Sequence, residues 1–177
     1  LIPLINPKKY LDSNPDFKVF YMDRIQKLTS LDAFLGISNS STDELISHLN
    51  IDSKFVYNIS SACDKNLFSP KSNQSNGLSH LNNNLGDYIL YTGAGDPRKN
   101  LTNLIKAYAS LPIALIVNYK LVLAGELIPA EIDNLNLLLD QLNFPREYVI
   151  LLGYVTDNQL VQLYRNCYLF VFPSFHE

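Results

Sequence analysis

Short apolar runs alternate with segments of helical periodicity in the second half of the chain, and this alternation limits the fold more than any other feature. We expect strands at 88–92, 120–124, 149–152 and 168–172, and helices at 100–111, 130–142 and 157–166. The runs are continuously apolar, which is typical of strands covered on both faces. This order predicts an α/β fold with a Rossmann-like, doubly wound parallel sheet.

The first part of the chain has the same character on a smaller scale. A helix is predicted at 15–28 and strands at 33–37 and 55–59. Ser41 and Glu44 have the spacing of a capping box, which predicts a helix from Ser41 to about Leu49. A strand, a helix and a strand in this order predict two parallel strands joined by a crossover.

A polar stretch rich in Ser and Asn separates these two parts. It occupies residues 69–86 and has the composition of a linker. The predicted organisation is therefore one domain at 1–68, a linker at 69–86 and a second domain at 87–177.

Composition excludes several classes of partner. The net charge is −3 and the pI is near 5.6, which argues against nucleic acid or an anionic membrane as the main partner. The apolar runs are too short to cross a bilayer, and no secretory signal is visible. We expect a cytoplasmic protein, with peripheral membrane attachment through other parts of a longer parent left open. Cys63 and Cys167 are expected to be buried, reduced thiols.

The loop at 93–100 is the first candidate site, because doubly wound sheets bind ligands beyond the carboxyl ends of their strands. Gly93 and Gly95 allow a sharp turn and a close approach of the backbone to a ligand. Arg98 and Lys99 stand at a predicted helix start, where the helix dipole disfavours cations. Two interpretations fit: the cations bind a phosphate or diphosphate, or they belong to a solvated turn.

Two further loops lie at the same expected edge. After Gly153, the side chains of Tyr154 and Val155 could line an apolar slot, although a purely structural role fits them as well. Glu177 follows the last strand and is a candidate polar contact. His176 has no second ligand at metal spacing, so no metal site is predicted.

Taken together, several segments resemble the donor domain of retaining glycosyltransferases of family 4, the group 1 transferases, which have the GT-B architecture. The segments are residues 91–100, 103–108, 120–126, 149–157, 160–167 and 169–177. Residues 32–38, 56–59 and 66–70 resemble the end of the acceptor domain of that family. The resemblance implies a truncated GT-B fold, in which 1–68 ends the acceptor domain and 87–177 begins the donor domain.

The resemblance also assigns roles to residues. Arg98 and Lys99 would bind the donor diphosphate and stabilise the departing nucleotide, with Gly93 and Gly95 beside it. The segment Gly153–Val155, with Tyr154, would contact the nucleobase. Glu177 would be the first Glu of the Glu-x7-Glu motif of the family, close to the donor sugar.

The implied activity is transfer of a sugar, with retention, from a UDP-, GDP- or ADP-sugar to a glycan or lipid-linked acceptor. The resemblance implies neither a cofactor nor a metal, and places the activity in polysaccharide biosynthesis. We expect this chain alone to be inactive and to self-associate through its truncated sheet. The alternatives are a non-catalytic, Rossmann-like module that binds a nucleotide or sugar phosphate, and a sugar-nucleotide epimerase.

Overall fold

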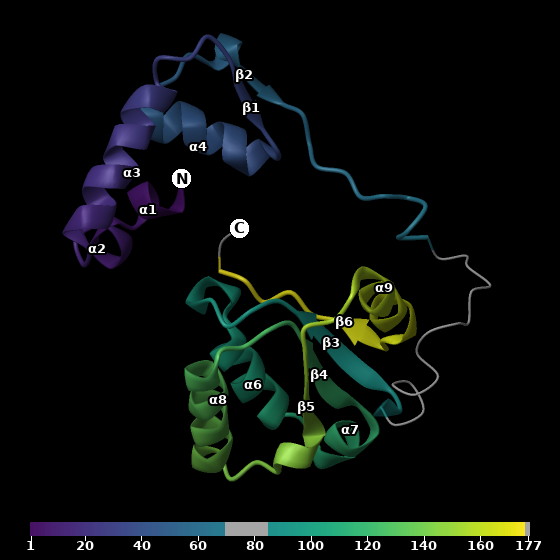
Figure 1. The fold of residues 1–177 in the computed structure, drawn as a ribbon. Coiled ribbons are helices and arrows are strands. Elements are labelled where there is room, and N and C mark those ends of the chain that lie inside the picture. Colours follow the sequence, from purple (N-terminus) through teal and green to yellow (C-terminus); the bar gives the residue numbers. More distant parts are fainter. Residues whose placement is uncertain (70–84, 176–177) are drawn as a thin grey trace. The chain divides into compact units, whose positions relative to one another are not determined.

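The structure is a computed structural model that describes residues 1–69 and 85–175 (Figure 1). The chain divides into two compact units, Leu1–Cys63 and Asp64–Glu177. Residues 64–69 thus group with the second unit. The predicted linker falls largely on residues 70–84, outside the described residues, and the domain boundaries stay a prediction.

The first unit is a small α/β unit with a two-stranded parallel sheet. Its helices are α1 (Ile2–Ile5), α2 (Pro7–Tyr10), α3 (Pro15–Leu28), α4 (Asn39–Leu49) and the 3-10 turn η1 (Ser53–Phe55). Strand β1 (Phe34–Gly36) pairs in parallel with β2 (Val56–Asn58). The predicted crossover is therefore confirmed, with α4 between the strands.

The predicted cap of α4 is wrong. Ser38, and not Ser41, has the extended backbone of a cap residue, and its hydroxyl accepts a hydrogen bond from the N–H of Ser41 at 3.1 Å. Ser41 thus lies inside the first turn. Glu44 does not complete a capping box and instead lies 3.3 Å from the amino group of Leu1.

The second unit contains a four-stranded parallel sheet in the order β5-β4-β3-β6. Its strands are β3 (Tyr88–Thr92), β4 (Lys120–Ala124), β5 (Val149–Gly153) and β6 (Leu169–Phe170). Its helices are η2 (Pro97–Lys99), α6 (Leu101–Ala109), α7 (Ile113–Asn118), α8 (Pro129–Gln141), η3 (Arg146–Tyr148) and α9 (Asp157–Asn166). The predicted parallel α/β sheet is confirmed.

Helices cover both faces of this sheet (Figure 1). One core lies under α6, α7 and α8, and the other lies under α9. Neighbouring residues of β3 alternate between the two cores: Tyr91 belongs to the first, and Leu90 to the second. The first core contains Tyr91, Leu104, Ile105, Tyr108, Ile116, Leu121, Leu123, Leu135, Leu139 and Val149. The second contains Leu85, Tyr88, Leu90, Val122, Ala124 and Leu163.

Two predicted elements of the second unit need correction. The helix predicted at 100–111 ends at Ala109, and a further helix, α7, follows Pro112. The strand predicted at 168–172 is reduced to β6, because the chain leaves the sheet towards Pro173, whose nitrogen cannot donate a hydrogen bond.

The two cysteines differ in their surroundings. Cys63 is exposed, so its predicted burial is wrong. Cys167 is partly buried beside the α9 core, and this burial raises the pKa of its thiol. Both thiols are free.

Candidate functional site

The site begins where β3 ends, in the loop that leads to α6. Gly93 leaves the strand with φ of +146° and donates its N–H to the carbonyl of Ala124 at 3.0 Å. The hydroxyl of Tyr91 donates to the carbonyl of Ala94 at 3.0 Å. The first half of the loop is therefore fixed against β4 and against its own strand.

Asp96 and Arg98 are joined by several hydrogen bonds in this loop. One carboxylate oxygen of Asp96 accepts the backbone N–H of Arg98 at 2.8 Å, which caps η2. The guanidinium of Arg98 donates to the same carboxylate from Nε at 3.0 and 3.1 Å and from Nη2 at 2.6 Å. These bonds, with the charges of Arg98 and Lys99, hold the pKa of Asp96 below its usual value. The loop itself thus supplies a carboxylate that pairs with Arg98.

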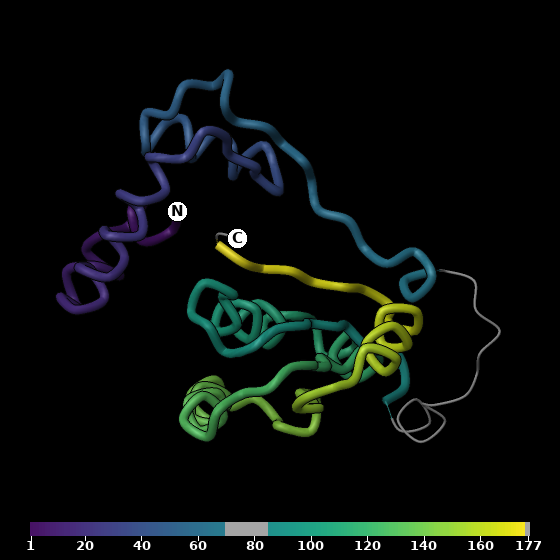
Figure 2. The backbone as a smooth tube through the Cα atoms, turned by 45° about the horizontal axis from the view of Figure 1, so that its top comes forward, coloured from purple at the N-terminus to yellow at the C-terminus, as the bar shows by residue number. Residues whose placement is uncertain are grey.

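The segment after β6 packs on the second half of the loop. The backbone N–H of Phe175 donates to the carbonyl of Arg98 at 2.9 Å, and the side-chain amide of Asn100 donates to the carbonyl of Pro173 at 3.0 Å. The ammonium of Lys99 lies 5.1 Å from the ring centre of Phe172, a cation–π distance. Figure 2 shows this C-terminal segment, in yellow, running beside the teal part of the chain that contains the loop.

The sheet order explains why this position suits a ligand. From β3 the chain first moves outward through β4 to β5, and β6 then returns to the other side of β3. The direction of winding therefore reverses between β3 and β6. Ligands of doubly wound sheets bind in the crevice at this switch point. Arg98 and Lys99 follow β3 and lie at that point.

The loop after β5 lies two strands away along the same edge. The carbonyl of Gly153 accepts the N–H of Gly125 at 2.9 Å, and Thr156 caps α9. Tyr154 is 77% exposed, whereas Val155 packs against the core under α9. Two strand spacings amount to about 10 Å, a span that a nucleoside diphosphate can cover.

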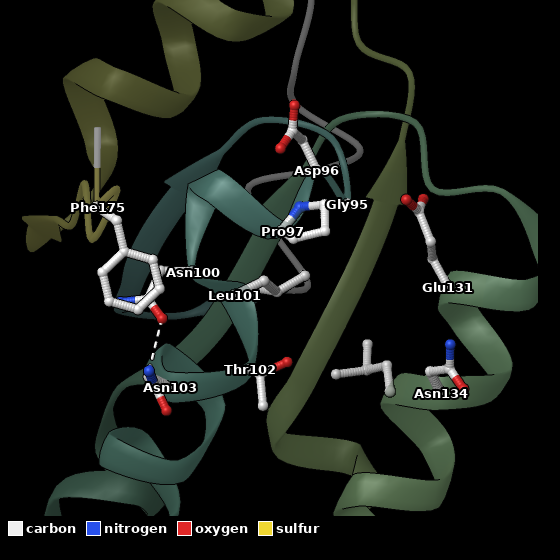
Figure 3. A pocket seen from close by; sticks show the side chains of 11 residues that line it. Gly95, Asp96, Pro97, Asn100, Leu101, Thr102, Asn103, Glu131, Asn134 and Phe175 are labelled. Atoms are coloured by element: carbon white, nitrogen blue, oxygen red, sulfur yellow. Dashed lines mark hydrogen bonds between the residues drawn. The ribbon is translucent and has the colours of Figure 1, made fainter. Parts of the chain in front are cut away.

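A pocket of about 360 Å³ opens beside the same loop (Figure 3). Gly95 lies close to Glu131, whose carboxylate a Cβ atom on Gly95 would overlap. The described lining contains two carboxylates and no lysine or arginine, so it is unfavourable for a diphosphate. Sequence reasoning did not find this pocket. It is lined by Gly95, Asp96, Pro97, Asn100, Leu101, Thr102, Asn103, Glu131, Asn134, Leu135 and Phe175.

Ser174 is another polar group that the sequence did not single out. Its hydroxyl oxygen is buried and has no hydrogen-bond partner in the described part of the chain. An unsatisfied buried hydroxyl is costly, so a polar ligand at this edge would stabilise it. The two residues of this segment that the sequence analysis did consider, His176 and Glu177, lie outside the described residues.

Within 1–69 and 85–175, no group of three or more His, Cys, Asp or Glu side chains could hold a metal ion. In the same ranges, no helix is both long and apolar enough to cross a membrane.

The fold is that of GT-B glycosyltransferases. The crystal structure of Anabaena Alr3699/HepE in complex with UDP is similar, with a TM-score of 0.67 and 21% identity over 82% of this chain and 39% of that one. Residues 79–177 match the family described as glycosyl transferases group 1, and the chain belongs to this family.

Two curated relatives come from Escherichia coli. The serotype-specific mannosyltransferase WbdA is 37% identical over 100% of this chain and 22% of its own length. O-antigen chain mannosyltransferase B is 30% identical over 93% of this chain and 43% of its own length. The chain thus spans less than half of each relative.

Proposed function

We propose that this chain belongs to a mannosyltransferase that moves a mannosyl residue from a nucleotide-activated donor to a glycan or lipid-linked acceptor in O-antigen assembly. The observation that carries the proposal is the position of Arg98 and Lys99 at the switch point between β3 and β6. The choice of mannose follows from the names of the two relatives.

The donor is proposed to lie along the carboxyl edge of the sheet. Arg98 and Lys99 bind its diphosphate, and the backbone at Gly93 and Gly95 approaches it closely. Gly153, Tyr154 and Val155 contact the nucleobase, and Glu177 contacts the sugar. Cations fixed beside the diphosphate stabilise the negative charge that develops on the departing nucleotide, without a metal or cofactor.

Retention of configuration is part of the proposal. Transfer then occurs on the face of the sugar from which the nucleotide departs. Arg98 and Lys99 serve this route because they support leaving-group departure and do not act on the acceptor. Since the chain spans 22% of the WbdA length, turnover is expected from the intact parent protein and not from this chain alone.

Nucleotide binding tests the assignment of the site. We would titrate the chain with UDP, GDP and ADP by calorimetry, beside the double variant Arg98→Ala/Lys99→Ala. A second double variant, Lys106→Ala/Arg146→Ala, removes the same charge from exposed positions. The expected result is binding of one nucleotide that is lost in the first variant and kept in the second. Equal binding by both variants would overturn the assignment.

Transfer itself requires the intact parent. Incubated with a mannosyl donor of the base identified above and a mannan acceptor, the parent should form a product whose anomeric configuration, measured by NMR, matches that of the donor. An inverted product would contradict retention, and transfer of a different sugar would contradict the choice of mannose.

A further inference from the structure

In the ion pair with Asp96, one edge of the Arg98 guanidinium, the group proposed to bind the phosphate, is already occupied. Nε and Nη2 of Arg98 form the edge with which a guanidinium binds a planar or tetrahedral anion bidentately. The carboxylate of Asp96 already occupies this edge, at 2.6–3.1 Å. Both side chains are about one third exposed, at 37% and 35%, so a ligand from solvent can reach the pair.

A carboxylate and a phosphate can both accept two hydrogen bonds from such a guanidinium edge. A diphosphate that binds bidentately to this edge would use the same donors that now contact Asp96. It also approaches the negative charge of Asp96 itself. The two anions therefore compete for one cation.

We propose that Asp96 is an internal stand-in for the donor diphosphate: it holds Arg98 in the ligand-free chain and releases it when the nucleotide binds. This inference rests on the proposed function. Asp96 is thus a positioning residue that acts through Arg98, and it lowers the affinity for the nucleotide while keeping the guanidinium at the site.

The variant Asp96→Asn separates this role from a structural one. An Asn side chain keeps the oxygen that accepts the Arg98 backbone N–H at 2.8 Å, so the cap of η2 is retained. What it loses is the charge that holds the guanidinium. We expect Asp96→Asn to bind the nucleotide about two- to fivefold more tightly, the range given by an exposed ion pair.

The chain supplies a matched control. Asp140, at the end of α8, forms a similar ion pair with Arg146. Its two carboxylate oxygens accept hydrogen bonds from Nη2 of Arg146, at 2.7 and 2.8 Å. Asp140→Asn makes the same change in net charge and breaks the same kind of pair. It should leave nucleotide affinity unchanged.

Calorimetry with the nucleotide, and with inorganic pyrophosphate as a base-free probe, decides between the outcomes. Tighter binding by Asp96→Asn and not by Asp140→Asn supports the inference. Unchanged or weaker binding by Asp96→Asn overturns it and leaves the proposed function intact. If neither probe binds the unaltered chain, the proposed diphosphate site fails, and the inference fails with it.

An NMR measurement on the unaltered chain tests the exchange without depending on the fold of a variant. The Nε–H signal of Arg98, identified by its loss in Arg98→Ala, should move when pyrophosphate saturates the site. In ligand-free Asp96→Asn it should already be displaced from its position in the unaltered chain. A signal that stays in place at saturation would show that Arg98 remains on Asp96, which overturns the proposal.

Discussion

The Cα atom of Gly125 faces the backbone of Gly93. A Cβ atom on Gly125 would overlap the carbonyl oxygen of Gly93 and would lie 2.7 Å from its carbonyl carbon. Both residues have φ values that L side chains rarely adopt, +147° and +146°. The residues that follow β3 and β4 therefore approach so closely that no side chain fits between them.

Gly125→Ala should destabilise the second unit by about 3 kcal/mol, because backbone strain and overlap with Gly93 act together. Thermal and urea unfolding of the chain measure the change. Gly86→Ala is the control: Gly86 also has positive φ, +64°, but an added Cβ meets nothing within 4 Å. It should cost only about 1 kcal/mol. Equal effects of the two variants would show that the contact with Gly93 relaxes at no cost.

Lys99→Ala in the intact parent should lower kcat about 10²–10³-fold, the effect of removing one fixed group that stabilises a developing negative charge. Steady-state transfer assays measure this. Lys106→Ala is the matched control, since Lys106 is an exposed lysine of α6 in the same part of the chain. Near-normal turnover of Lys99→Ala would remove Lys99 from the proposed machinery.

The elements that sequence reasoning placed well are those in which several local signals agree. Strands β3 and β4 have the predicted bounds because each is a continuous apolar run. Helix α9 also has its predicted bounds, since Thr156 and Gln159 cap each other's backbone groups across its first turn. In these segments the local preference and the tertiary fold require the same conformation.

The failures occurred where local signals compete. The run Ile113–Val117 is rich in β-branched residues, yet it forms α7 because burial of Ile116 against the first core decides its conformation. Asp96 was not predicted as the partner of Arg98, because a bond between side chains two residues apart depends on the turn between them. The sheet order, and with it the switch point, depends on pairing between distant strands that spacing alone does not specify.

Alkaline pH should destabilise the second unit. Burial raises the pKa values of Tyr88 and Tyr108 to about 12, from 10.0. Between these values the unfolded chain loses phenolic protons that the folded chain keeps, so the stability present below pH 10 is lost as the pH rises towards 12. Urea unfolding at about pH 9 and about pH 11 measures the loss.

Two variants separate this effect from general alkaline unfolding. Tyr88→Phe removes one of the buried phenols and should make the loss of stability with pH smaller, whatever its effect on absolute stability. Tyr154→Phe changes an exposed ring and should leave the pH dependence as it is. If both variants keep the full dependence, Tyr88 does not contribute to it.

Arg165 should fix the segment that enters the second unit. Its guanidinium donates to the carbonyl of Ser69 from Nε at 2.9 Å and from Nη2 at 2.6 Å, and to the carbonyl of Leu67 at 3.4 Å. Phe68 adds a ring contact with Tyr164, with centroids 6.4 Å apart. These contacts explain why residues 64–69 group with the second unit and not with the first one.

Arg165→Ala should therefore accelerate proteolysis and amide exchange at residues 64–69 by about tenfold, since hydrogen bonds from a charged group are lost. Arg165→Lys should restore part of the protection, because an ammonium can still donate to the Ser69 carbonyl. Arg146→Ala, which breaks an exposed pair with Asp140, is the control and should change nothing at this segment. Unaltered protection in Arg165→Ala would mean that other contacts hold the segment, and that Arg165 does not define where the second unit begins.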